Sequence, residues 1–102
     1  MITNIAITKA KLNEYQIFDV RTPLEWEEGV LENAELVYLY DNQGFINPNF
    51  SQEVKEKLND KPLAFVCRSG NRSQIAAQIV QDELGLSSTN LEGGMMAYHK
   101  EK

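Results

Sequence analysis

The apolar run Leu63-Ala64-Phe65-Val66 constrains the fold of this chain more than any other feature. Pro62 precedes it, and Cys67 with a polar stretch follows it at once. A short apolar run without alternation, bounded by breakers, is typical of a strand buried on both faces. Such strands occur in parallel sheets covered by helices, so this run predicts an α/β domain with the strand near its centre.

Strands and helices alternate along the rest of the chain. Further strands are predicted at residues 4–7, 16–20, 35–40 and 89–91. Helical segments are predicted at residues 23–28, from residue 49 or 51 to 58, at 73–84 and after Gly94. The alternation predicts an α/β fold with a central, mostly parallel sheet and helices on both faces.

Two of these helices carry clear local signals. Thr22-Pro23-Leu24-Glu25 has the composition of a capping box with proline at the first helical position. Residues 73–84 have helical periodicity, and Gly85 is placed to end that helix. Its expected apolar stripe consists of Ile75, Ala76, Ile79, Val80 and Leu84.

The composition is that of one soluble globular domain, which we place at residues 1–102. A net charge of -5 repels phosphate backbones and anionic lipid, so neither nucleic acid nor membrane is an expected partner. The N-terminus lacks the basic segment of a signal peptide, and no apolar run is long enough to span a bilayer. A single cysteine excludes an intramolecular disulfide and a multi-cysteine metal site, and it suits the reducing cytoplasm, where we expect the protein.

That cysteine, Cys67, stands where the buried strand ends. In open α/β sheets, ligands bind in the crevice beyond the carboxyl ends of the strands. A loop that leads into a helix points free amides inward, and Gly70 lets the backbone bend. These amides, with Arg68 and Arg72, should stabilise a thiolate, which is the nucleophilic form. A lone cysteine after an apolar strand is more often a structural thiol, but a structural thiol gains nothing from such a polar loop.

The side chains of the loop suit an anionic substrate. The planar guanidinium groups of Arg68 and Arg72 offer paired donors to oxyanions such as a sulfonate. Ser69 and Ser73 can donate hydrogen bonds to a terminal sulfur atom or to substrate oxygens.

Three stretches of the chain resemble the motifs of rhodanese-family sulfurtransferases, in the family's order and spacing. The first is Phe18-Asp19-Val20-Arg21-Thr22-Pro23-Leu24-Glu25-Trp26, the second is Cys67-Arg68-Ser69-Gly70-Asn71-Arg72-Ser73, and the third is Leu91-Glu92-Gly93-Gly94-Met95-Met96-Ala97-Tyr98. Together they span most of the chain. The resemblance implies a three-layer α/β/α domain.

The same resemblance implies a function. Cys67 would accept a sulfane sulfur from a small anionic donor such as thiosulfate and hold it as a persulfide. Cyanide in an assay, or a thiol or a protein in the cell, would then take the sulfur. The backbone and side chains of Arg68, Ser69, Gly70, Asn71, Arg72 and Ser73 would form the cradle, and neither cofactor nor metal is implied.

The sequence departs from the family pattern at two places. Gly29-Val30-Leu31 stands where the family often has Gly-His-Ile, which alters local packing without removing the nucleophile. Tyr98 stands where the closing motif usually has tryptophan, and it can fill much of the same space.

Three other functions compete with sulfur transfer. Dual-specificity phosphatases of the cell-division-cycle type share the fold, but their loop has five residues between cysteine and arginine. Here four residues separate Cys67 from Arg72, which suits a single sulfur atom better than a phosphoryl group. A non-catalytic rhodanese-like interaction module is the second alternative, although such modules commonly lack the cysteine. A thioredoxin-like redox protein would need a second cysteine near the first.

Several remaining residues have expected structural roles. Trp26 is expected in the core, His99 on the surface, and the run Glu25, Glu27 and Glu28 on a solvated face. Asp19 is expected either to pair with Arg21 or loop amides, or to lie near the substrate.

Overall fold

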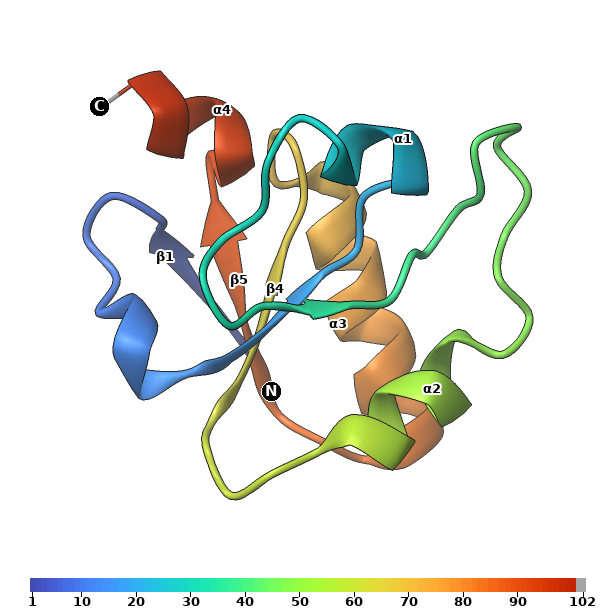
Figure 1. Ribbon diagram of the computed structural model, residues 1–102. Coiled ribbons are helices and arrows are strands. Elements are labelled where there is room, and N and C mark those ends of the chain that lie inside the picture. The colour runs from blue at the N-terminus through green and yellow to red at the C-terminus, as the bar shows by residue number, and fades with distance from the viewer. Residues whose placement is uncertain (101–102) are drawn as a thin grey trace.

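The computed structural model describes residues 1–100 and contains one five-stranded sheet (Figure 1). The strands are β1 (Ile2–Ala6), β2 (Gln16–Asp19), β3 (Glu35–Leu36), β4 (Leu63–Val66) and β5 (Ser88–Glu92). All neighbours pair in parallel, in the order β1-β5-β4-β2-β3. The last two residues of the predicted domain 1–102 lie outside the described residues.

Helices cover both faces of the sheet, which confirms the predicted three-layer α/β/α fold (Figure 1). They are the 3-10 helix η1 (Leu12–Glu14) and the α-helices α1 (Pro23–Trp26), α2 (Phe50–Lys57), α3 (Asn71–Leu84) and α4 (Gly94–Lys100). Buried residues of α2 and α3 belong to the core cluster on one face. Residues of η1 and α4 pack against the cluster on the other face.

Strand β4 lies at the centre of the sheet, as its apolar sequence predicts. Phe65 points to the α2 and α3 side, where its ring centroid lies 5.9 Å from that of Phe18 and 6.2 Å from that of Phe50. The alternate residues Ala64 and Val66 join the core cluster on the other face. A strand that buries both faces needs apolar side chains at every position, which explains the unbroken run.

The strand order brings the three sequence motifs to one edge of the sheet. Strands β5, β4 and β2 are consecutive neighbours, and because all are parallel their carboxyl ends share that edge. The first and third motifs begin in β2 and β5, the second begins directly after β4, and each continues into the loop and helix that follow. The sheet therefore gathers motifs that lie far apart in the sequence.

The predicted strand at residues 35–40 is shorter than expected, because only Glu35–Leu36 pairs in the ladder. The amides of Val37 and Leu39 still donate to the carbonyl oxygens of Asp19 and Val20, but β2 ends at Asp19. Without a neighbouring strand to follow, the segment continues as irregular backbone.

Helix α3 also differs from the prediction. It begins at Asn71, two residues earlier than expected, because Gly70 caps it with a φ of 109°. The expected stripe residue Ile75 is 43% exposed, whereas Ala77 is buried. The helix packs closely on the sheet through small side chains, so its buried face is centred nearer Ala77 than the apolar pattern predicts.

Candidate active site

The Cys67 side chain lies at the end of β4, inside the core cluster shared with α3. It is only 1% exposed. The backbone N–H of Gly70 donates a hydrogen bond to its sulfur atom over 3.1 Å. This bond closes the three-residue loop at residues 68–70, which is shorter than the loop predicted to reach Arg72, since α3 begins at Asn71. The sulfur is thus held at the amino-terminal end of a long helix, where partial positive charge favours an anion.

Helix α4 holds the same loop from its other side. The amides of Met95 and Met96 donate to the carbonyl oxygens of Cys67 and Arg68 over 2.8 and 2.9 Å. In a trans peptide the carbonyl and the following N–H point in opposite directions, and the described chain has no cis peptide. The N–H groups of Arg68 and Ser69 therefore point away from α4.

Gly94 makes this contact possible. A Cβ atom built on Gly94 would overlap the Cys67 carbonyl oxygen and would lie 2.6 Å from the Arg68 carbonyl oxygen. Its φ of 57° is also in the left-handed region. The second glycine of the closing motif is thus required by close backbone approach as well as by conformation.

Arg72 forms a bidentate ion pair with Glu25 of α1. The Arg72 Nη1 and Nη2 atoms lie 2.7 and 2.9 Å from the Glu25 carboxylate oxygens. The hydrogen bonds from Arg72 lower the pKa of Glu25 to about 2, although partial burial opposes that shift. The hydrogen bond with Glu25 raises the pKa of Arg72 above its ordinary value. Arg72 therefore anchors α3 to α1 and has only part of its guanidinium left for a substrate.

Glu25 also completes the predicted capping box of α1. The Thr22 side chain accepts from the Glu25 amide, and the Glu25 carboxylate accepts from the Thr22 amide over 3.0 Å. The expectation that Glu25 lies on a solvated face with Glu27 and Glu28 holds only in part for Glu25, because capping and pairing leave 21% of its side chain exposed. Glu27 and Glu28 are exposed as expected.

Asp19 and Arg21 form a separate, buried ion pair. Arg21 donates from Nε and Nη2 to the Asp19 carboxylate, with a shortest distance of 2.8 Å, and Nη2 also donates to the Gly29 carbonyl oxygen. Of the expectations for Asp19, pairing with Arg21 is the one the structure supports. The pair fixes the turn between β2 and α1, and thereby the position of Glu25.

The other predicted site residues occupy the rim and the interior. Arg68, Ser69 and Asn71 are exposed. Ser69, Gly70 and Asn71 line an open polar depression of about 430 Å³, which also includes Asn90. Ser73 is fully buried, and its hydroxyl oxygen lies 3.4 Å from the Cys67 sulfur.

Sequence analysis did not single out Asn90, which lies in β5 and is 3% exposed. It accepts a hydrogen bond from the Ser73 hydroxyl over 2.5 Å. A polar side chain in a strand that lies between a buried strand and an edge strand must find hydrogen-bond partners within the protein. That requirement was the signal by which sequence analysis could have found Asn90.

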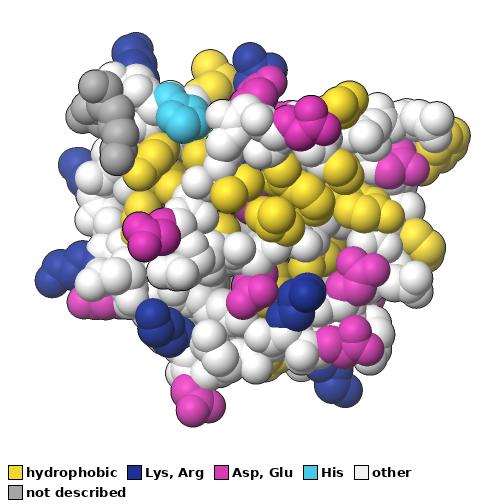
Figure 2. Space-filling view, viewed as in Figure 1, with side chains coloured by type: hydrophobic (Ala, Val, Ile, Leu, Met, Phe, Trp, Pro, Cys, Tyr) yellow, Lys and Arg dark blue, Asp and Glu magenta, His cyan; other side chains and the backbone are white. Residues whose placement is uncertain are grey.

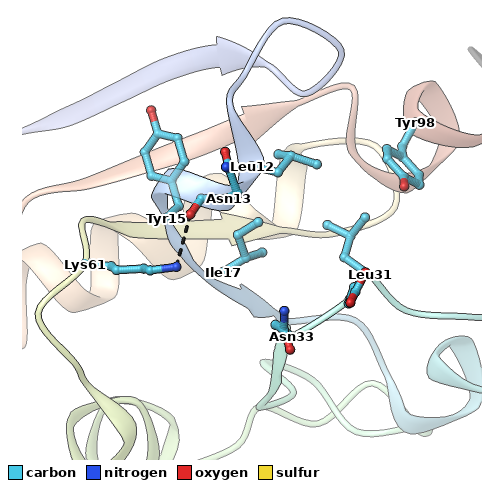
Figure 3. A pocket seen from close by; sticks show the side chains of 9 residues that line it. Leu12, Asn13, Tyr15, Ile17, Leu31, Asn33, Lys61 and Tyr98 are labelled. Carbon is cyan, nitrogen blue, oxygen red and sulfur yellow. Dashed lines mark hydrogen bonds between the residues drawn. The ribbon is translucent and has the colours of Figure 1, made fainter.

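A more enclosed depression, of about 350 Å³, lies on the η1 and α4 side of the sheet (Figure 3). Leu12, Ile17 and Leu31 give it an apolar part, and Lys61 donates from its amine to the Asn13 carbonyl oxygen near its rim. No residue of the Cys67 loop lines it. None of its lining residues is a cysteine, so the candidate active site remains the Cys67 loop.

Within residues 1–100, no group of three or more His, Cys, Asp or Glu side chains is arranged to hold a metal ion. Over the same residues, no helix has the length and apolar character needed to cross a membrane. Trp26 was expected in the core but is half-buried, and its ring centroid lies 6.4 Å from that of Tyr38 with the rings tilted at 55°. His99 is exposed as expected.

Comparison with known proteins identifies the family. Residues 5–101 match the family model "Rhodanese-like domain", so the chain belongs to the rhodanese-like domain family. It is 33% identical over 88 residues to a Bacillus subtilis protein named "Putative sulfurtransferase YtwF", covering 86% of this chain and 77% of that protein. It is 35% identical over 92 residues to "Adenylyltransferase and sulfurtransferase MOCS3" of Drosophila virilis, covering 86% of this chain but only 20% of that protein.

The fold agrees with this family. The crystal structure of a rhodanese-like domain protein from Staphylococcus aureus superimposes with a TM-score of 0.74 at 28% identity, covering 94% of this chain and 90% of that chain. The relatives named as sulfurtransferases support a sulfurtransferase-type role for this chain at the level of the family.

Replacing Gly94 by alanine should destabilise the domain more than the same change at Gly85. Both residues have a left-handed φ, of 57° and 68°, but a Cβ atom on Gly85 has nothing within 4 Å. We expect Gly85→Ala to cost about 1 kcal/mol of unfolding free energy and Gly94→Ala to cost more than about 2 kcal/mol, because the Cys67 loop must move. Urea denaturation measures both, and equal costs would contradict the close contact of Gly94 with the loop.

Replacing Glu25 by glutamine should remove a stabilisation that depends on pH. A carboxyl group with a lowered folded pKa stabilises the protein above its unfolded pKa, and this contribution is lost as pH falls through the folded value. The Glu25 contribution should therefore be full above the ordinary value of 4.5 and disappear as pH approaches about 2. We expect Glu25→Gln to cost about 1 kcal/mol at neutral pH, since the pair is partly exposed.

The matched control is the exposed residue Glu28 on the same segment. Denaturation of the wild type, Glu25→Gln and Glu28→Gln between about pH 7 and pH 2 gives the free energy of unfolding of each protein at each pH. The difference from the wild type is then compared between the two variants. A Glu25→Gln curve parallel to that of the wild type at all pH values would show that the ion pair does not stabilise the fold.

Proposed function

We propose that this protein is a sulfurtransferase that carries a sulfane sulfur on Cys67. The observation that carries the proposal is the Gly70 amide, which donates to the Cys67 sulfur at the start of α3. Amides and a helix amino terminus directed at one sulfur stabilise the anionic forms that the chemistry needs. The family and the names of the relatives are consistent with this role.

The reaction has two displacement steps. The Cys67 thiolate attacks the outer sulfur of thiosulfate, a new S–S bond forms, and sulfite leaves with the electron pair of the broken bond. The acceptor then attacks the terminal sulfur of the persulfide, and the Cys67 thiolate leaves. With cyanide as the acceptor the product is thiocyanate. The oxidation states balance without an added oxidant or reductant.

The donor in this proposal is a small anion. Cys67 is 1% exposed, so a bulky donor has little access to its sulfur. Among residues 1–100, the two ion pairs engage Arg21 and Arg72, which leaves the exposed Arg68 as the loop cation available to donor oxygens. Ser69, Gly70 and Asn71 supply the remaining rim of the cradle, and Ser73 supplies its floor.

A protein is a second class of acceptor. Figure 2 shows hydrophobic side chains gathered across part of one face, with carboxylates around them. The exposed Leu24 lies within the capping segment of α1, next to Glu25, the partner of Arg72. An acceptor protein that contacts this rim would bring a thiol near Cys67. A reducing, cytoplasmic setting would keep that thiol and Cys67 free.

The competing proposal is a non-catalytic module in which Cys67 is a core thiol. Its burial and its place in the core cluster favour that alternative. The hydrogen bond from Gly70 and the exposed arginine favour sulfur transfer, because neither is needed to bury a thiol.

Cys67→Ser should abolish the formation of thiocyanate from thiosulfate and cyanide. Serine keeps the size of the side chain but cannot form a persulfide, so the loss should be complete while the fold persists. Colorimetric thiocyanate assays on both proteins give the rates, and circular dichroism checks the fold. Equal rates, or no turnover by the wild type, would contradict the proposal, and turnover of an aryl phosphate instead would favour a phosphatase.

A further inference from the structure

A buried chain of polar side chains leads from the Cys67 sulfur to β5. The Ser73 hydroxyl oxygen lies 3.4 Å from the sulfur and 2.5 Å from the Oδ1 atom of Asn90. Ser73 is completely buried and Asn90 is 3% exposed. With so little exposure, their hydrogen bonds to other protein groups fix their mutual orientation.

The orientation of the Asn90 amide follows from its surroundings. Its Nδ2 atom lies 3.3 Å from the Gly70 carbonyl oxygen and 3.0 Å from both the Asn4 Oδ1 and Gln74 Oε1 atoms. A backbone carbonyl can only accept, so the amide nitrogen must be on that side. The Asn90 Oδ1 atom therefore faces Ser73 and can only accept.

This orientation determines what Ser73 offers to the sulfur. A hydroxyl group has one proton, and the short bond to Asn90 uses it. Toward Cys67, Ser73 then presents a lone pair, so it accepts a hydrogen bond from the thiol and does not donate one to the sulfur. The expectation that Ser73 donates to a terminal sulfur does not fit this arrangement.

We propose that Asn90 is a positioning residue for the sulfur chemistry of Cys67, an inference that rests on the proposed function. Asn90 holds Ser73 as a hydrogen-bond acceptor and also donates to the carbonyl oxygen of Gly70, the residue whose N–H donates to the same sulfur. One side chain thus sets both hydrogen-bond partners of Cys67. Ser73 stabilises the resting thiol, while Gly70 remains the donor to the thiolate and the persulfide.

Charged groups also lie in the loop and on the elements next to it. They are Arg72 at the start of α3, Arg68 in the loop, Glu25 on α1, the pair Asp19 and Arg21 at the end of β2, Glu92 at the end of β5, and His99 and Lys100 near the end of α4. None of them is changed in the variants below, so their contributions cancel in a comparison with the wild type.

The test is the pH dependence of Cys67 alkylation by iodoacetamide, followed by intact mass. Ser73→Ala should move the midpoint of the curve of alkylation rate against pH to lower pH by about half a unit. The reason is that the thiol loses its hydrogen-bond acceptor whereas the thiolate loses no donor. Asn90→Leu should also lower the midpoint, since it frees the Ser73 hydroxyl to donate to sulfur. Adding Asn90→Leu to Ser73→Ala should give no further decrease.

Asn90→Asp separates positioning from a general structural role. The carboxylate still accepts from Ser73 and adds negative charge, so the midpoint should rise, whereas a loosened structure would shift both Asn90 variants in the same direction. The matched control is Asn47→Leu, which disrupts another buried amide, one that donates to Tyr38 and Glu53 and not to a residue of the Cys67 loop. It should leave the midpoint unchanged.

An unchanged or higher midpoint in Ser73→Ala would overturn the proposal, and so would a lower midpoint in Asn90→Asp. If Asn90→Leu fails to fold, the midpoints of Ser73→Ala and Asn90→Asp still test the proposal. Alkylation needs no sulfur donor, so this result stands whether or not thiosulfate is turned over. Failure of the proposed function is seen separately, in the thiocyanate assay.

Discussion

The candidate site depends on two hydrogen bonds that helix α4 donates to carbonyl oxygens of the Cys67 loop. The amides of Met95 and Met96 bind the carbonyl oxygens of Cys67 and Arg68, which turns the following N–H groups away from α4. Only glycine at position 94 lets the backbones approach this closely. A short C-terminal helix thereby decides which way the cysteine loop faces, although it contributes no side chain to the sulfur's hydrogen bonds.

Two ion pairs hold the opposite side of the loop. Arg21 with Asp19 fixes the turn after β2, and Arg72 with Glu25 joins α1 to the first turn of α3. These ion pairs engage Arg21 and Arg72, two of the arginines that the sequence places near the cysteine. The site therefore combines the Gly70 amide at the start of α3 with one exposed arginine, Arg68, in a protein whose net charge is -5. We propose that this small site suits a single anionic sulfur better than a larger phosphoryl group.

Much of the fold was predictable because its signals are local. The central strand follows from an unbroken apolar run, the start of α1 from a capping box, and the end of α3 from Gly85. The three motifs gather at one edge of the sheet because the carboxyl ends of parallel strands share that edge. Cys67 and its loop were predicted from their position after the apolar strand, the family resemblance implied the sulfur chemistry, and the structure adds the bond from Gly70 to the sulfur.

The unpredicted features depend on contacts between distant segments. Glu25 and Arg72 are 47 residues apart, so the sequence shows two charges but not their pairing. Asn90 meets Ser73 only because β5 lies beside β4 and α3 packs over both. The exposure of Ile75 depends on how closely α3 approaches the sheet, which small side chains such as Ala77 permit.

The central claim is that Cys67 itself holds the transferred sulfur, and intact mass spectrometry after incubation with thiosulfate tests it most directly. The account predicts that the wild-type chain gains the mass of one sulfur atom, that cyanide removes it, and that Cys67→Ser gains nothing. A wild-type chain whose mass stays unchanged, or a Cys67→Ser chain that gains the same mass, would contradict the account.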